Sequence, residues 1–236
     1  IDNLLMASGQ NDNTLYTISL INQEITMQTH DTLPRLISSA VPKEQDKIIF
    51  ISGDDKIAEF DKKTLDLAAK DIAFPLPVKI KTLAIFNRRI YTLDQETNQI
   101  YKHNQTLNGY DKGVPWITDQ GVDIKNAMSL AIDGDLFILG GNGIVTKLSA
   151  GKQVLFETSG ILPPLKNPTE IWTYADTQNI YLLEPAGKRI VVINKVGKFI
   201  KQYVSEQWTN PVSMSVDEKS KTIYILDNNK IWKFGM

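Results

Sequence analysis

The sequence contains no cysteine, so disulfide bonds, thiol catalysis and cysteine-bound metals are all excluded. It also lacks a long apolar run: the longest purely aliphatic stretch is Ile190 to Ile193, whereas a membrane-spanning helix needs roughly 20 apolar residues. We therefore expect no membrane span within this chain, and no signal-peptide pattern opens it. The first residue is Ile1 rather than Met, so we expect a piece of a longer polypeptide, in which a missing segment could tether it to a membrane.

An excess of charge of one sign is also missing. The chain has 26 basic and 27 acidic residues among 236, for a formal net charge of −1. Binding to nucleic acid usually depends on a strongly basic surface, so no nucleic-acid partner is expected. A length of 236 residues is enough for one large all-β domain with a substantial core, and no linker composition interrupts it. We therefore predict one domain over residues 1–236.

What the sequence does have is an internal repeat. A short phrase recurs six times, with two apolar strands joined by a turn rich in Gly, Asn and Asp, as in "NIYLLEPAGKRIVVIN" and "TIYILDNNKIWKF". The first apolar anchors of the six copies are spaced 41 to 46 residues apart; they are Leu5, Ile49, Ile90, Leu136, Ile180 and Ile223. The second anchors are Leu15, Ile57, Ile100, Ile144, Ile190 and Ile231. Each copy predicts a β-hairpin whose two faces are both covered, because its apolar residues are nearly continuous rather than alternating.

Two further strands flank most hairpins. A moderately apolar segment such as "VKIKTLAIF" precedes them, and a weaker one such as "KFIKQYV" follows. Four strands in each unit of this length are typical of a β-propeller blade. We therefore predict an all-β, six-bladed β-propeller whose first and last blades are incomplete, with three strands each. Aromatic residues at equivalent second-strand positions should lie between blades; they are Tyr91, Phe137, Tyr181 and Tyr224.

The hairpins "IYTLDQETNQIYKH" and "IYLLEPAGKRIVVINKVGKFIKQY" resemble those of the bacterial NHL and YncE-like propellers. The resemblance runs through all the hairpins and is strongest from Asn167 to Phe234. More narrowly, the chain is similar to propeller ectodomains of uncharacterised bacterial membrane proteins. This resemblance implies a rigid binding platform, in some members sensory and in NHL proteins sometimes RNA-binding. It favours an extracytoplasmic or cell-surface location over a cytoplasmic one.

Ligands of such platforms usually meet the loops at one end of the blades, where the hairpin turns and the crossings between blades converge. One long crossing, residues 110–126, carries stacking and acceptor groups, and a later crossing carries a second tryptophan. We predict a ligand-binding sector made of Tyr110, Trp116, Asp119, Asp123, Glu184, Arg189 and Trp208. The alternative for Trp116 and Trp208 is that each covers the seam between two blades.

Repeated carboxylates offer a second kind of site. Asp133, Asp176 and Asp217 end first strands, while Asp94, Glu184 and Asp227 begin hairpin turns. A ring of such groups could hold Ca²⁺, but repetition in every blade favours capping of backbone N–H groups, so neither a metal nor a cofactor is predicted.

Histidines and a glycosylation pattern give weaker signals. The only histidines, His30 and His103, fall in different classes of loop and are expected to be solvated rather than catalytic. The triplet "NQT" at residues 104–106 matches a glycosylation acceptor, a pattern that is common by chance.

The end of the blades opposite the hairpin turns is slightly more basic. Arg88 and Arg89, together with Lys43 and Lys47, could approach anionic lipid if the domain is tethered. A solvated rim explains the same residues.

The function that fits these observations is a non-catalytic binding module, with a sensory role included, for an unknown protein, peptide or glycan. One alternative is a six-bladed hydrolase or lyase of the lactonase type, which needs acids, Asn or His converging on a metal. Another is a structural component of a cell-surface assembly, which would be favoured if another chain completed the short blades.

Overall fold

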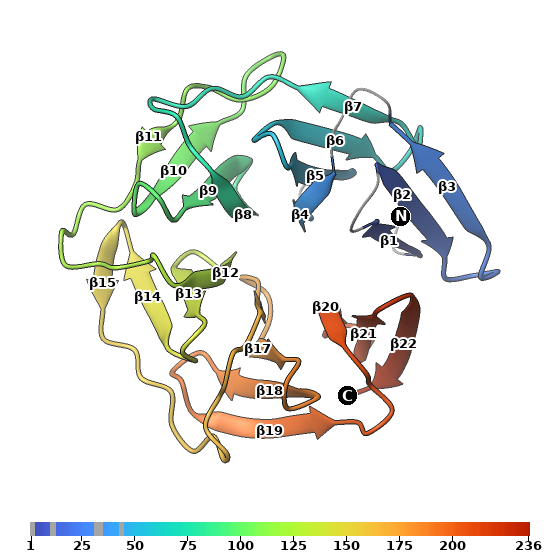
Figure 1. Ribbon diagram of the computed structural model, residues 1–236, viewed down its shortest axis with the longest axis vertical. Helices are drawn as coiled ribbons and strands as arrows, with labels where there is room; N and C mark the ends of the chain where they lie inside the picture. The colour runs from blue at the N-terminus through green and yellow to red at the C-terminus, as the bar shows by residue number, and fades with distance from the viewer. Residues whose placement is uncertain (1–2, 10–12, 31–34, 43–44) are drawn as a thin grey trace. The chain divides into compact units, whose positions relative to one another are not determined.

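A computed structural model describes residues 3–9, 13–30, 35–42 and 45–236. All its regular elements are β-strands, and they form six small antiparallel sheets that follow one another along the chain (Figure 1). The fold is a six-bladed β-propeller, as the repeat predicts. Its chain consists of two compact units, residues 1–116 and 117–236, with three sheets in each. The single domain predicted from composition stays a prediction.

In the first unit, two four-stranded sheets follow a three-stranded one. Its strands are β1 (Leu4–Ser8), β2 (Thr14–Ser19), β3 (Ile25–Thr29), β4 (Leu36–Ala40), β5 (Lys47–Ser52), β6 (Ile57–Asp61), β7 (Leu67–Lys70), β8 (Ile80–Phe86), β9 (Arg89–Asp94), β10 (Gln99–Asn104) and β11 (Val114–Pro115).

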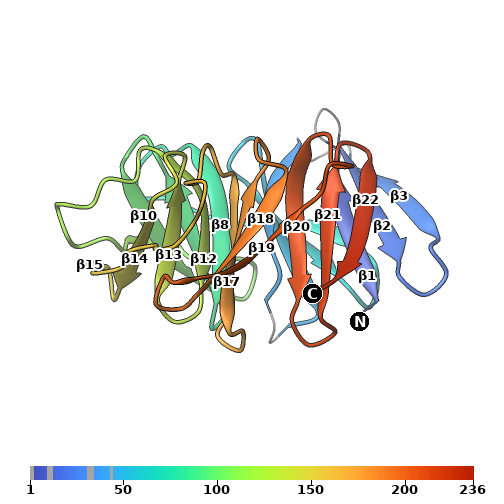
Figure 2. The ribbon, with the colours of Figure 1, turned by 90° about the horizontal axis from the view of Figure 1, so that it is seen from below.

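In the second unit, the three-stranded sheet comes last (Figure 2). Its strands are β12 (Ala127–Ile132), β13 (Leu136–Gly140), β14 (Val145–Ser149), β15 (Lys152–Val154), β16 (Glu170–Trp172), β17 (Asn179–Glu184), β18 (Arg189–Asn194), β19 (Phe199–Val204), β20 (Pro211–Asp217), β21 (Thr222–Asp227) and β22 (Lys230–Gly235). The prediction of incomplete first and last blades is therefore confirmed.

The two-sided apolar pattern reflects packing of each sheet against its neighbours within a unit. One cluster joins β13 and β14 to β17 and β18, and contains Phe137 and Ile180. The next joins β17 and β18 to β20 and β21, and contains Tyr181 and Ile223. Of the four aromatic positions, Tyr91, Phe137 and Tyr181 are buried as expected, whereas Tyr224, in the last sheet, is only half-buried.

Two of the expected hairpin anchors differ from the prediction. Ile144 lies just before β14 and is 60% exposed, because Val145 takes the buried position beside Leu139. Ile231 is 39% exposed, since its strand, β22, has no fourth strand beside it among the described residues. The register of the β13–β14 pair thus places Val145 rather than Ile144 in the core. Ile231 is exposed because its sheet has only three strands in the described part of the chain.

Each blade has two distinct ends. At the hairpin end lie the turns between the second and third strands, and at the opposite end lie the turns between the first and second and between the third and fourth strands. The first unit keeps this direction from sheet to sheet: the Gln45 side chain, before β5, donates to Gln105, after β10, at 3.2 Å. Groups on equivalent turns of one unit therefore share an end.

Candidate functional site

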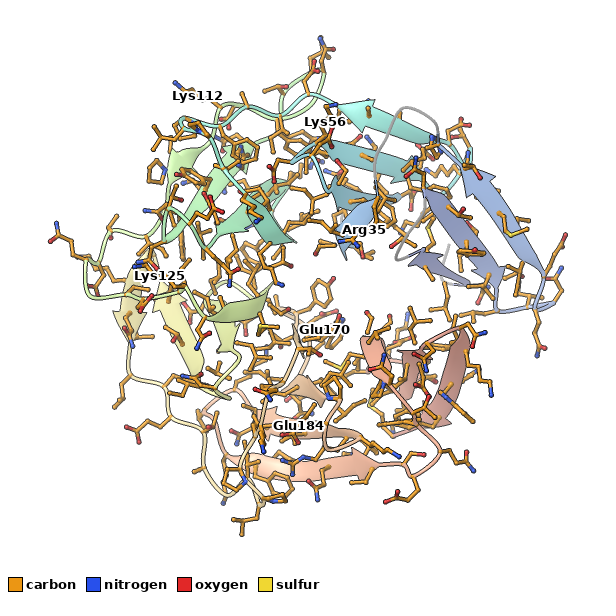
Figure 3. All side chains as sticks on the ribbon, in the orientation of Figure 1. Arg35, Lys56, Lys112, Lys125, Glu170 and Glu184 are labelled. Carbon is orange, nitrogen blue, oxygen red and sulfur yellow. The ribbon has the colours of Figure 1, made fainter. Side chains whose placement is uncertain are left out.

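Glu184 and Arg189, which flank the β17–β18 hairpin turn, form a buried ion pair. Their side chains are 3% and 4% exposed, and the Arg189 Nε donates to Glu184 Oε2 (Figure 3 labels Glu184). The remaining donors of the guanidinium reach the carbonyl oxygen of Pro163 at 2.8 Å and the side chain of Gln202 at 3.0 Å. The backbone N–H of Lys166 donates to the other Glu184 oxygen. The pair thus fastens the crossing before β16 to the hairpin turn, and it offers little surface to a ligand.

Trp208 lies between two sheets of the second unit. It is 3% exposed and belongs to the cluster that joins β17 and β18 to β20 and β21. Its ring packs at 5.8 Å from Phe234, and its backbone N–H donates to the Ser205 carbonyl. The alternative interpretation, in which this tryptophan covers a seam between blades, describes its position.

The segment 110–126 is not one crossing. Strand β11 interrupts it and pairs with β10, so that Tyr101 faces Pro115. Tyr110 precedes β11 and lies at the opposite end, whereas Trp116 follows β11 and lies near the hairpin end. The two predicted site residues are thus separated along β10. The sequence interpretation missed β11 because a two-residue strand ending in Pro carries almost no apolar pattern.

Tyr110 is buried in the core of the first unit. It is 7% exposed and packs among isoleucines of β5, β8 and β9. Its hydroxyl donates to Glu59 at 3.0 Å, and the same glutamate holds Lys47 at 2.7 Å. Burial, with the Glu59 carboxylate beside it, raises the pKa of the Tyr110 hydroxyl far above its usual value. Tyr110 thus completes the packing of the core and hydrogen-bonds the buried carboxylate of Glu59.

Trp116 keeps part of its surface. Its ring meets Tyr91 edge to face, with centroids 5.6 Å apart, and its backbone N–H donates to the Ile100 carbonyl at 2.7 Å. The side chain is half-buried. One edge is therefore held in place while the rest stays accessible, which is the arrangement of an aromatic anchor.

Asp119 and Asp123 project from a well-anchored segment of the second unit. Val122 and Ile124 are 3% and 2% exposed, and the Thr118 N–H donates to the Gly151 carbonyl at 2.9 Å. Asp119 accepts from the Gly121 N–H at 3.0 Å, while Asp123 is exposed and accepts from the Lys125 N–H at 3.0 Å. The segment presents two carboxylates on a backbone that is fixed before any ligand arrives.

The repeated turn carboxylates act as caps. Asp94 accepts from the Glu96 N–H at 3.0 Å and the Thr97 hydroxyl at 2.7 Å. Asp227 accepts from the Thr209 N–H at 2.9 Å and the Trp232 indole at 3.2 Å. Although loss of hydration opposes ionisation, these donors hold the pKa of Asp227 below its ordinary value. No cluster of three or more potential metal-binding side chains occurs among residues 3–9, 13–30, 35–42 and 45–236.

The expectation of a solvated His103 is wrong. It lies within β10, is fully buried, and its Nδ1 is 3.0 Å from the Asp111 carbonyl oxygen, to which it can donate. Its Nε2 is 3.2 Å from the Thr92 hydroxyl. Burial lowers its pKa, so the ring is neutral at pH 7. The signal that could have shown this is the spacing in "QIYKHN": His103 is two residues after Tyr101, so both side chains lie on the same face of β10, and both are buried. His30 is half-buried at the end of β3.

One hollow was not identified from the sequence as a pocket. It is open, has a volume of about 340 Å³, and lies at the opposite end of the first unit; it is lined by Asn87, Arg88, Arg89, Asn104, Gln105 and Thr106. The Arg89 Nε donates to the Asn104 side chain at 3.1 Å. Asn104, the first residue of the glycosylation pattern, also donates to Asp111 at 2.7 Å, so its amide is already engaged. Lys43, one of the basic residues expected at this end, lies outside the described residues.

Comparison with known proteins shows the fold alone. No protein-family model matches the sequence, and none of the curated proteins matches it either. Solved structures match at 12–13% identity, among them PorZ of Porphyromonas gingivalis, described as an essential bacterial surface component of the type-IX secretion system. That match covers 99% of this chain and 37% of PorZ, with a TM-score of 0.57, so the chain spans little more than a third of PorZ.

Two further matches are to proteins of unknown function. One, from Desulfotomaculum acetoxidans, has a TM-score of 0.66 at 12% identity, covering 99% of this chain and 79% of the other. The second, from Bacteroides caccae, has a TM-score of 0.63 at 12% identity, covering 95% and 82%. In the described part of the chain, no helix is long and apolar enough to cross a membrane.

Proposed function

We propose that this chain is a non-catalytic binding module that recognises a protein, peptide or glycan at the hairpin end of its second unit. The observation that carries the proposal is the anchored segment 117–126. Val122 and Ile124 are buried, Asp119 is half-buried and Asp123 is exposed, and the half-buried Trp116 precedes the segment in the sequence. A preorganised backbone loses little entropy on binding, and aromatic anchors are enriched among the residues that dominate recognition surfaces.

The other members of the predicted sector support this module indirectly. Glu184, Arg189, Trp208 and Tyr110 are buried and hydrogen-bonded or packed within their own units. Glu184, Arg189 and Trp208 give rigidity to loops of the second unit, whereas Tyr110 lies at the opposite end of the first unit. Asp94, one of the acids that a lactonase-type enzyme could use, accepts from the Glu96 N–H at 3.0 Å and so caps a hairpin turn.

The test is to recover ligands from a peptide-display library and an immobilised glycan panel with the full chain. For a recovered ligand, Trp116→Ala should weaken binding, raising the dissociation constant by about 5- to 150-fold. Asp119→Asn with Asp123→Asn removes two charges but keeps oxygen atoms that can accept the capping N–H groups. The matched control is Asp61→Asn, a change to a residue that caps a turn at the opposite end of the first unit. Stoichiometric divalent metal together with turnover of a lactone panel would instead establish the enzyme.

A second candidate is a structural component of a bacterial cell-surface assembly. The likeness to PorZ favours it, and so do the NHL and YncE-like hairpins and the resemblance to propeller ectodomains. In cells that carry the gene, the chain should then be accessible to an externally added protease and should crosslink to surface proteins. Protection from the protease in intact cells would contradict this location.

A further inference from the structure

The hollow at the opposite end of the first unit is lined by groups suited to an oxyanion. Arg88 and Arg89 are adjacent and exposed, and the loop after β10 adds the amide of Gln105 and the hydroxyl of Thr106. The Asn104 amide also lines the hollow but is already held by Asp111. Arginine binds phosphate through several N–H donors in a planar fork, which is why it is common in phosphate sites. The guanidinium of Arg88 makes no hydrogen bond or ion pair with any residue in the described ranges. One cation of the hollow is therefore unused within the fold.

The backbone at Arg88 has an unfavourable conformation. The turn between β8 and β9 has positive φ at Asn87 (49°) and Arg88 (60°). A two-residue turn of this kind favours Gly in its second position, and an arginine there is uncommon. Arg88 lies on this turn, and Arg89 begins β9 opposite Asn104, the last residue of β10. Two consecutive arginines therefore lie at the same end of the sheet.

Exposed aliphatic side chains share this end. Each turn between a third and a fourth strand in the first unit carries one, as does the turn after β2: Ile21 is 78% exposed, Leu65 is 48% exposed and Leu107 is 97% exposed. Leu107 is on a tight turn, since the Thr106 N–H donates to the Gly109 carbonyl at 2.8 Å. Single exposed aliphatics are ordinary, but three on turns at one end form a pattern.

Two acidic groups near the hollow are already engaged. Asp111 accepts from the Asn104 side chain and from the N–H groups of Asn104 and Gly113, and despite loss of hydration these donors lower the pKa of its carboxyl. Asp46 pairs with Lys63 at 2.7 Å. Neither carboxylate is among the residues that line the hollow.

We propose that the opposite end of the first unit rests on an anionic lipid surface, with a lipid phosphate in the Arg88–Arg89 hollow and the aliphatic turns entering the interface. Basic residues near an anionic membrane and apolar side chains in its interface add to each other, and two such signals together give stable binding. The residues of this site all belong to the first unit and do not include any residue of segment 117–126.

The test measures co-sedimentation of the full chain with phosphatidylcholine vesicles, with and without phosphatidylglycerol as about one third of the lipid. The chain should bind the anionic vesicles and leave the neutral ones, and Arg88→Ala with Arg89→Ala should lower the partition coefficient by about tenfold or more. The matched control, Lys56→Ala with Lys79→Ala, removes two exposed cations near the hairpin end of the same unit and should bind as the parent does.

Insertion has its own readout. Leu107→Trp places an indole on the most exposed of the three turns, and its fluorescence should shift to the blue on anionic vesicles only. Free glycerol phosphate should compete only at concentrations far above the lipid phosphate, because it lacks the interface. The proposal is overturned by equal binding to neutral vesicles, by no binding to anionic ones, by an unchanged double-arginine variant, or by glycerol phosphate as potent as the vesicles.

Discussion

Gly109 and Gly197 make equivalent contacts in the two units, each on a turn that follows the third strand of a sheet. At both, a Cβ atom would lie 2.1 Å from a backbone carbonyl oxygen of the crossing that precedes that sheet, namely that of Asp71 for Gly109 and that of Glu157 for Gly197. The contact accompanies a parallel bridge in each unit, Asp71 to Gly109 and Ser159 to Lys198. Each crossing is thus held to the neighbouring blade by a backbone bridge. Only glycine allows the turn to come so close to the backbone of the crossing.

Replacing either glycine with alanine should therefore separate the crossing from its blade. We expect Gly109→Ala and Gly197→Ala each to lower the free energy of unfolding by about 2–4 kcal/mol, because the clash is with backbone rather than with a flexible side chain. Gly53→Ala is the control, since its Cβ would meet its nearest neighbour at 3.6 Å. Chemical denaturation measures all three. If Gly109→Ala or Gly197→Ala were as stable as the parent, the corresponding bridge would not contribute to stability.

The buried pair Glu184–Arg189 should be costly to break on one side. Arg189→Met leaves the Glu184 carboxylate buried without its partner, and we expect a loss of about 3–5 kcal/mol. Removing both charges, with Glu184→Leu and Arg189→Met, should cost less than the sum of the two single changes. The exposed pair of Lys79 and Glu96, 3.8 Å apart, gives the comparison: Lys79→Ala should change stability by less than about 0.5 kcal/mol. Strict additivity at the buried pair would contradict this account.

The two tryptophans of the predicted sector should behave differently. Trp208→Ala removes a ring that is 3% exposed between two sheets, so unfolding should become easier by about 3–5 kcal/mol. Trp116→Ala should cost less stability, because that ring is only half-buried, and its main effect should be on ligand binding. Thermal melting and a binding titration on the same two variants separate the roles. A Trp208 variant of full stability that fails to bind would return Trp208 to the binding surface.

The sequence predicted the repeat well because blade strands obey a simple rule. The anchors, Ile180 and Ile190 among them, recur every 41 to 46 residues, and sheets that pack on both faces must be apolar on both faces. The site was harder to predict, because a polar residue at a turn looks the same whether it faces solvent or caps a backbone. Glu184 and Arg189 differ from surface charges only through their partner across the turn. His103 differs from a loop histidine only through the strand that extends past it.

Removing residues 1–9 should destabilise the first unit. Strand β1 pairs with β2 from Leu4 to Ser8, and Met6 packs against the cluster that includes Leu15 and Leu36. Without it, β2 becomes an edge strand and part of the core is uncovered. We expect a melting temperature lower by at least about 5 °C, given that 1 kcal/mol corresponds to about 2–4 °C at this size. An unchanged melting temperature would mean that β1 contributes nothing to the sheet.

Glu170, labelled in Figure 3, gives the last prediction, on pH. It lies on β16, where its carboxylate accepts from the Met214 N–H at 2.7 Å and from the Ser213 hydroxyl at 3.4 Å. Loss of hydration outweighs these donors and raises the pKa of Glu170 to about 7, from an ordinary value of 4.5. Between these two values the folded chain binds more protons at this group than the unfolded chain, so the contribution of Glu170 to stability falls as pH rises.

The slope from this one group should approach 1.4 kcal/mol per pH unit in the middle of that window and vanish on both sides of it. Glu170→Gln removes the charge and keeps an oxygen for the Met214 N–H, so the variant should gain stability relative to the parent as pH rises from about 4.5 to 7. The difference between parent and variant, measured by denaturation at several pH values, cancels every other titrating group. A difference that stays constant across that window would show that the carboxyl ionises in the folded chain as it does in the unfolded one.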